Sequence, residues 1–271
     1  MTRDRYLNFG GIPVRFRVRR PLGQPKNRVL MIPSPLLRAE LFEPLAARLS
    51  ENGCLCVYCD LPGFGVTAAN AQKFTDPQTA ARMLWGVLDT LDSEEGGRLS
   101  CWHIISHGLA AQTCWDMVRL SPDSVATIVH LCPAFAAPSI LQKPTWYALL
   151  CRLASGRIAF SGMARLFFGR SMPSRETEPL RRAFLRPGVQ ENLGSMLTRK
   201  PPQAPLFSFS PKLVLWSGQD GILGGKIPPE VTAALPDAEY HTMRTSGHVP
   251  MVTHPRAVSD FLRGWMTENG S

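Results

Sequence analysis

Two residues able to move protons stand after predicted strands in the last quarter of the chain. Asp220 follows an apolar run at 212–216, and His248 lies in the turn after a run at 239–243. A carboxylate bound to one imidazole nitrogen fixes the tautomer and stabilises the imidazolium, so the other nitrogen can accept a proton. Asp220 and His248 are therefore the chain's candidates for a general-base pair.

The elements that must position these residues alternate along the chain. Short, mostly apolar runs predict strands over residues 28–32, 54–59, 101–105, 125–131 and 212–216, and an alternating pattern predicts an edge strand over 9–19. A last strand is predicted over 239–243. Helical spacing predicts helices over 40–50, 76–91, 109–119, 231–235 and 255–266. This order predicts an α/β fold with a doubly wound, mostly parallel sheet.

The alternation stops between residues 136 and 205, where the pattern predicts several helices rich in Leu, Phe and Arg. We expect a core of residues 1–135 and 206–271, with 136–205 inserted as a helical cap. Open α/β sheets bind their ligands at the carboxyl ends of the strands. The predicted cap would cover that edge.

The predicted cap also carries most of the net charge of the chain. It contains eleven Lys and Arg against three Glu and no Asp, a net charge of +8, while the whole chain has +9. No nucleic-acid-binding motif accompanies this charge, so we expect no nucleic-acid partner. A small-molecule ligand with an anionic group, an acyl carrier protein or an anionic membrane surface fits at least as well, and so does a solvated basic face.

The cysteines and the N-terminal residues indicate the cellular compartment of the protein and whether it binds a metal. Seven cysteines without a framework spacing indicate reduced, buried thiols. No C-x-x-C or paired-histidine spacing supports zinc, so we expect neither a metal nor a cofactor. No apolar run reaches about eighteen residues and no signal segment is recognisable, which predicts a cytoplasmic protein.

Five segments appear in an order that resembles a known superfamily. They are residues 29–32 with the break after them, 60–65 (DLPGFG), 105–111 (ISHGLAA), 218–220 (GQD) and 247–248 (GH). This set resembles the capped branch of the α/β-hydrolase superfamily, which includes esterases, epoxide hydrolases and carbon–carbon-bond hydrolases. The resemblance implies the α/β-hydrolase fold, with Asp220 and His248 at the positions of the acid and the base.

The departure from this family lies at the strand-to-helix turn that carries its nucleophile. That turn needs small residues on both sides of the nucleophile because it leaves no room for side chains. Ser106 and Ala110 are the small neighbours here, which places Gly108 at the nucleophile position, between His107 and Leu109. A competing register takes Ser106 as the nucleophile but puts an isoleucine at a small position. In the first register the protein lacks the serine nucleophile.

The oxyanion hole of the family is altered as well. The resemblance assigns one backbone donor to Leu109 and matches the family's His-Gly pair to Pro33-Ser34, so that Pro35 stands where the second donor belongs. Proline has no N–H, and losing one such donor costs roughly 3–4 kcal/mol of transition-state stabilisation. Together with Gly108, Pro35 disfavours ordinary ester hydrolysis by a catalytic triad.

A few other side chains are weaker candidates for pocket lining. They are Cys132, Trp146, Phe167 and Phe168, and packing is the alternative role for each. Among the remaining histidines, we expect His103 and His130 to be core residues within strands.

Three functions are compatible with these residues. The first is a non-covalent general-base enzyme that performs lyase, carbon–carbon cleavage, cofactor-free oxygenation, cyclisation or hydrolytic chemistry on a small, partly apolar metabolite. The second is a non-catalytic binding protein that keeps the pocket. The third is an ordinary serine esterase or thioesterase in which the nucleophile has been replaced. We favour the first because Pro35 departs from the family pattern independently of Gly108.

Overall fold

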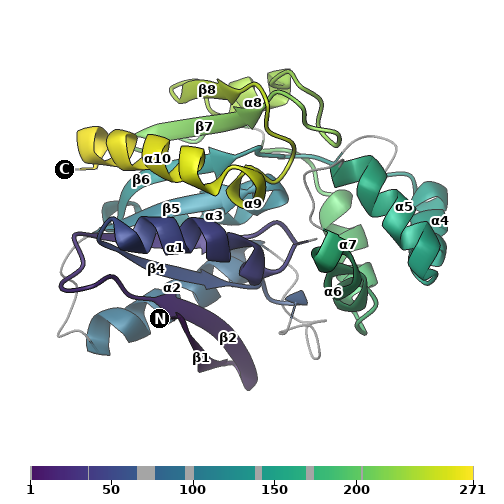
Figure 1. Ribbon diagram of the computed structural model, residues 1–271, viewed down its shortest axis with the longest axis horizontal. Helices are drawn as coiled ribbons and strands as arrows, with labels where there is room; N and C mark the ends of the chain where they lie inside the picture. Colours follow the sequence, from purple (N-terminus) through teal and green to yellow (C-terminus); the bar gives the residue numbers. More distant parts are fainter. Residues whose placement is uncertain are drawn as a thin grey trace.

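A single sheet of eight strands lies at the centre of the structure (Figure 1), a computed structural model that describes residues 2–35, 37–65, 77–94, 101–137, 142–168, 174–202 and 204–270. The strands stand in the order β1-β2-β4-β3-β5-β6-β7-β8. Their bounds are β1 Thr2–Phe9, β2 Ile12–Arg19, β3 Asn27–Ile32, β4 Cys54–Cys59, β5 Trp102–His107, β6 Val125–Leu131, β7 Lys212–Ser217 and β8 Glu239–Met243.

The sheet is parallel from β4 to β8 and antiparallel at its first edge. β1 pairs with β2, and β2 with β4, in antiparallel register, whereas the other neighbours run parallel. The prediction that the strand around residues 12–19 lies at the edge was wrong, because β1 covers it. β1 was missed because the segment TRDRYLNF is too polar to show a buried pattern.

Helices cover both faces of the sheet, as the alternation predicts. One core packs β-strand residues such as Leu30 and Ile32 against α2, α3 and α8, and the other packs Val29 and Met31 against α1, α9 and α10. The alternate residues of β3 therefore point into two different cores. The helices are α1 Glu43–Glu51, α2 Pro77–Glu94, α3 Ala111–Leu120, α8 Pro229–Ala234, α9 Pro250–Thr253 and α10 Pro255–Asn269, and short 3₁₀ turns η1 Ala39–Phe42 and η3 Gly108–Ala110 precede α1 and α3.

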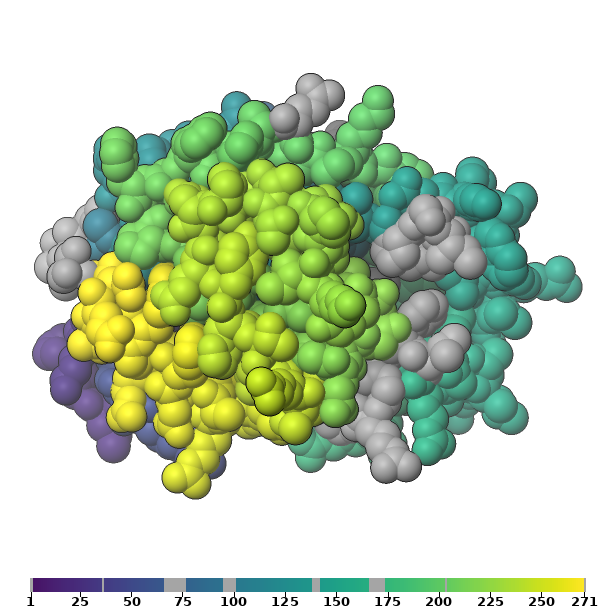
Figure 2. Space-filling model, turned by 90° about the horizontal axis from the view of Figure 1, so that it is seen from above, coloured from purple at the N-terminus to yellow at the C-terminus, as the bar shows by residue number. Residues whose placement is uncertain are grey.

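Four further helices are inserted between β6 and β7 and gather at one end of the sheet (Figure 1). They are α4 Pro144–Ala154, α5 Arg157–Phe168, α6 Ser174–Phe184 and α7 Val189–Leu197. In Figure 2 their teal surface lies to one side of the yellow and green C-terminal segments. No helix in the described segments is long and apolar enough to cross a membrane.

The segment 60–65 connects this inserted region to the sheet. The carboxylate of Asp60 accepts a hydrogen bond from the Ala39 N–H at 2.7 Å, and Gly65 adopts a φ of +56° beside it. A Cβ on Gly65 would lie 2.0 Å from that carboxylate, so only glycine fits. Asn192 of α7 and Arg186, after α6, donate to the Gly63 and Gly65 carbonyls at 3.2 and 2.6 Å.

A buried ion pair ties β3 to α2, and its loss should be costly. Arg28 pairs with Asp92, and Trp102 Nε1 donates to the same carboxylate at 3.5 Å while its ring lies 5.3 Å from the guanidinium. Asp92→Asn should lower the free energy of unfolding by about 3 kcal/mol because it replaces the carboxylate paired with a buried guanidinium by a neutral amide. Urea denaturation measures this, with Asp260→Asn as the control.

Asp260 forms an exposed pair with Arg256 at 3.8 Å, so its substitution should cost below about 1 kcal/mol. An equal decrease in the free energy of unfolding in Asp92→Asn and Asp260→Asn would contradict a special role for the buried pair.

Candidate functional site

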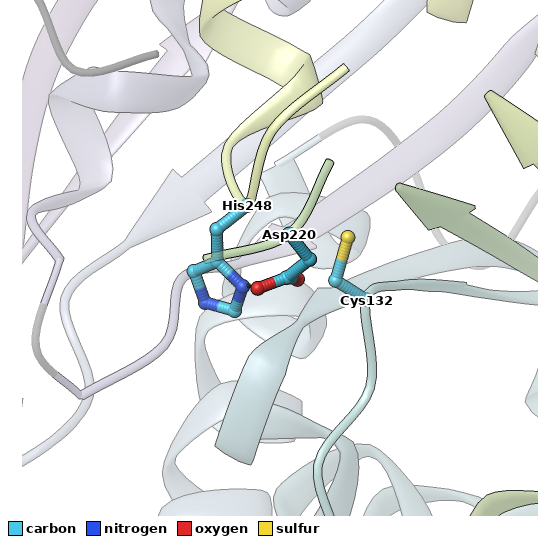
Figure 3. A group of neighbouring side chains, drawn as sticks. All are labelled: Cys132, Asp220 and His248. Atoms are coloured by element: carbon cyan, nitrogen blue, oxygen red, sulfur yellow. Dashed lines mark hydrogen bonds and ion pairs between the residues drawn. The ribbon is translucent and has the colours of Figure 1, made fainter. Parts of the chain in front are cut away.

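The two residues singled out for proton transfer lie in contact. His248 Nδ1 lies 2.7 Å from Asp220 Oδ2, and both side chains are almost fully buried. Asp220 follows β7 and His248 lies in the loop after β8, so the parallel strands bring them to one edge of the sheet. Figure 3 shows Asp220 between the His248 ring and Cys132. In the neutral ring, the Nδ1–H donates to the carboxylate and the lone pair stands on Nε2.

Asp220 is held in its ionised form by its surroundings. Burial alone would raise its pKa, but the hydrogen bond from His248 and those from the Ile222 and Leu223 N–H groups, each 2.8 Å from Oδ1, outweigh it and lower the pKa. Both carboxylate oxygens are therefore bound to donors. The carboxylate can stabilise a proton that arrives on His248.

His107 fixes the backbone of His248. Its Nε2–H donates to the His248 carbonyl at 2.8 Å, and the two rings meet edge to face with centroids 4.7 Å apart. Burial, together with the neighbouring His248, lowers the pKa of His107 to about 3. His107 is thus a neutral positioning residue. Its position before Gly108 was noted in the sequence, but this contact was not foreseen.

Gly108 forms the sharp turn between β5 and η3, with a φ of +55° that side-chain-bearing residues rarely adopt. A Cβ placed there would lie 3.8 Å from His248 Nε2 and 3.1 Å from Ser34 Oγ. His248 Nε2 therefore lies close to the point where a side chain at position 108 would begin. Leu109, next along η3, has its N–H at a helix start, where such groups lack an intrahelical acceptor.

Ser106 lies elsewhere in the core. Its hydroxyl is 2.6 Å from His130 Nδ1 on β6, and both side chains are fully buried. This geometry favours the register that places Gly108, rather than Ser106, at the turn beside His248. His103 also packs within the sheet, where its Nδ1 lies 2.8 Å from the Thr127 hydroxyl.

The loop after β3 brings Ser34 and Pro35 to the same point. The Leu37 N–H donates to the Ser34 carbonyl at 2.7 Å, with Pro35 as the first residue inside that turn. Ser34 is buried beside Gly108. The resemblance places Ser34 on this loop, and the structure adds that its side chain lies close to Gly108.

Cys132 completes a cluster of possible metal ligands, since its sulfur and the ligand atoms of Asp220 and His248 lie within 4.8 Å of one another. The chemistry favours hydrogen bonding instead. Burial and the nearby Asp220 raise the thiol pKa well above its usual range, and Sγ donates to Ser217 Oγ at 3.1 Å. A protonated thiol is a poor metal ligand. The absence of a metal stays a prediction. Cys132 lies on the side of Asp220 away from the His248 ring (Figure 3).

Cys132 is also the one described non-glycine residue with a positive φ, of 45°. Its strained backbone sits just beyond β6. Sequence patterns do not reveal such a conformation.

The three aromatic residues predicted to line a pocket are not shown to do so. Trp146 lies on α4 with 47% of its surface exposed, and the side chains of Phe167 and Phe168 lie outside the described residues. Their role in lining a pocket stays a prediction. The seven cysteines are free, but the expectation that all are buried was wrong, because Cys101 is exposed and Cys151 is half-buried.

A cleft of about 390 Å³ opens where α6 meets the core. It is lined by Arg38, Gly65, Glu178, Pro179, Arg182, Ala183 and Arg186. Hydrogen bonds from Arg181 and Arg182, with the charge of Arg157 nearby, lower the pKa of Glu178 to about 2. Positive charge thus outweighs negative around this cleft, in agreement with the basic composition of the inserted region.

Residues 29–261 match a family model described as the alpha/beta hydrolase family. The chain belongs to this family. The match includes the turn at Gly108, Asp220 and His248, and the sheet with its inserted helices is the α/β-hydrolase fold. A comparison with curated proteins finds no match.

Solved structures of this fold resemble the chain over nearly its whole length. Cfl2 from Burkholderia cenocepacia has 17% identity and a TM-score of 0.77, with 97% of this chain and 95% of that chain covered. The serine hydrolase CarC, described as involved in carbazole degradation, has 13% identity and a TM-score of 0.76 over 99% and 100%. E-2-(acetamidomethylene)succinate hydrolase has 15% identity and a TM-score of 0.74, with 98% of this chain and 100% of that chain covered. At these identities the likeness shows the fold alone.

Three buried histidines should make the stability of this α/β-hydrolase-family protein depend on pH. Burial lowers the pKa of His103 to about 4 and the pKa values of His107 and His130 to about 3, from 6.5. Below pH 6.5 the unfolded chain therefore binds protons that the native state does not. The free energy of unfolding should fall between pH 7 and pH 5, by roughly 2 kcal/mol per histidine.

Urea unfolding at the two pH values measures this dependence. His130→Gln should remove about one third of it, whereas His241→Gln, at an exposed position of β8, should leave it unchanged. A free energy of unfolding that is equal at pH 7 and pH 5 would contradict neutral, buried histidines.

Proposed function

We propose that the protein is a general-base enzyme that acts on a small, partly apolar metabolite without forming a covalent enzyme intermediate. One observation carries this proposal. The His248–Asp220 pair is hydrogen-bonded at 2.7 Å, and His248 Nε2 would lie 3.8 Å from a Cβ at Gly108, the point where a nucleophile's side chain would begin. The histidine has its acid partner, while position 108 beside it carries no side chain.

The chemistry that follows uses the chain's own groups. His248 Nε2 takes a proton from the substrate or from a water molecule, and Asp220 stabilises the imidazolium that forms. His107 keeps the His248 backbone in place through its hydrogen bond to the carbonyl. Its low pKa keeps the His107 ring neutral, so it does not compete with His248 for the proton. The proton later returns from Nε2 to the product. No step requires an attack by a side chain.

A cleft away from the dyad suggests a substrate with an anionic group. It lies between α6 and the core, and its three arginines, Arg38, Arg182 and Arg186, outnumber its one acid, Glu178, so that it attracts anions. One structural neighbour is named as the hydrolase of a substituted succinate, a dicarboxylate, and another is described as acting in carbazole degradation. Small dicarboxylates and acidic aromatic compounds are therefore the first compounds to screen.

Variants at the dyad and at the turn test the function. For any compound that the protein turns over, His248→Gln should lower kcat by about 100-fold or more because the base is lost. Gly108→Ser should not raise kcat, since the mechanism needs no nucleophile. Steady-state kinetics measure both, and His241→Gln serves as the matched control at an exposed histidine.

Two results would contradict the proposal. Turnover that survives in His248→Gln would remove the dyad from the mechanism. A large gain in ester hydrolysis in Gly108→Ser would instead indicate a serine hydrolase whose nucleophile has been replaced.

A further inference from the structure

Helix α4 carries apolar side chains on two sides, and the fold uses only one of them. On one side Ala154 is buried and Tyr147 is half-buried against the core. On another side Trp146, Leu149 and Leu153 are between 42% and 47% exposed. Their spacing of three and four residues places them in one stripe along the helix. This stripe has no partner among the described residues that buries it.

A fourth exposed apolar side chain follows at the start of α5. Only Ser155 and Gly156 separate the two helices, and Ile158, in the first turn of α5, is 90% exposed. In Figure 1 α4 and α5 form the outer end of the inserted region. We call Trp146, Leu149, Leu153 and Ile158 the outer apolar face. Large apolar side chains exposed together in this way usually mark an interaction surface.

The charge that accompanies this face is of one sign. Residues 136–175 contain six Lys and Arg and no Asp or Glu. Arg152 on α4 and Arg165 on α5 are exposed. Arg157 lies 3.7 Å from Glu178, but that carboxylate also pairs with two arginines of its own helix. The two helices therefore combine an apolar stripe with a net positive charge.

We propose that the outer apolar face docks onto an anionic lipid surface. A helix does so by burying its apolar side chains among the headgroups while its Lys and Arg side chains are attracted to the anionic lipids. A tryptophan suits this position, because one end of its ring is apolar and the other can be hydrated. The proposal goes beyond the proposed function and holds whichever reaction the dyad performs.

Charge also argues against a second copy of the chain as the occupant. In a two-fold symmetric contact the same face of both copies meets, so the positive charges of residues 136–175 would lie against each other. The same segment contains no carboxylate that could pair with them. An anionic partner has no such penalty.

The tryptophans provide a direct readout of docking. The chain has six, and Trp146 is the exposed one, because the other five are buried: Trp85, Trp102, Trp115, Trp216 and Trp265. Vesicles of equimolar phosphatidylcholine and phosphatidylglycerol should shift the emission of the unaltered protein to shorter wavelength. Vesicles of phosphatidylcholine alone should shift it much less, and high salt should weaken the effect. Trp146→Phe should abolish the shift although the protein still sediments with the vesicles.

Sedimentation with the anionic vesicles measures the contribution of the apolar stripe. Ile158→Gln should lower the partition coefficient about 10-fold, because the side chain that is lost is exposed in the free protein and buried in lipid. Phe209→Gln is the matched control, since Phe209 is fully exposed but lies in the loop before β7. Its partition coefficient should stay unchanged.

The contribution of charge has a matched pair of its own. Arg152→Glu should lower the partition coefficient about 10-fold. Arg263→Glu changes the net charge equally but at an exposed position of α10, and it should have little effect.

Three results would overturn the proposal. The first is no sedimentation of the unaltered protein with the anionic vesicles, which would leave an acidic protein as the candidate occupant. The second is an equal decrease in Ile158→Gln and Phe209→Gln, or in Arg152→Glu and Arg263→Glu, because adsorption would then not use this face. The third is sedimentation without a shift in the emission of Trp146.

Discussion

The turn from β5 into η3 at Gly108 determines how the rest of the site can be arranged. Its positive φ directs the chain sharply from the strand into the helix, and the loops after β3 and β8 close on it from two sides. A parallel sheet makes this convergence possible because its strands all end at the same edge. Ser34, Asp220 and His248 are thus brought together by strands that are far apart in the sequence.

The residues around this turn form successive layers of support. Behind Asp220, the Cys132 thiol donates to Ser217, whose hydroxyl also accepts from Ser246 at 2.8 Å. Beside His248, the neutral ring of His107 holds the backbone carbonyl. These hydrogen bonds hold the loops on both sides of the dyad in place. Such rigidity is what a base needs when no covalent bond to the enzyme positions the substrate.

The sequence predicted the layout of the fold well, and the site in part. The strands over 54–59, 125–131 and 239–243 have the predicted bounds, because their apolar or alternating runs are ended by clear turn signals. β1 was missed, since an exposed hairpin strand needs no apolar pattern. The helix predicted over 76–91 is described from Pro77 as α2, and its predicted first residue, Asp76, lies outside the described residues.

For the site, the order of the motifs was sufficient to predict that Asp220, His248 and Gly108 lie close together. The approach of Ser34, the contact of His107 and the strained Cys132 depend on how loops fold over one another, which no local pattern encodes. The boundaries of the cap and its anionic partner, whether a small molecule, an acyl carrier protein or a membrane surface, stay predictions for the same reason.

The most direct test of the account is the ¹⁵N NMR spectrum of His248 in protein labelled at histidine, assigned with His248→Gln. The account predicts that the neutral ring carries its proton on Nδ1, hydrogen-bonded to Asp220, with a lone pair on Nε2, and that Asp220→Asn alters this tautomer. A neutral ring that carries its proton on Nε2, or a spectrum insensitive to Asp220→Asn, would contradict a base whose Nε2 faces Gly108.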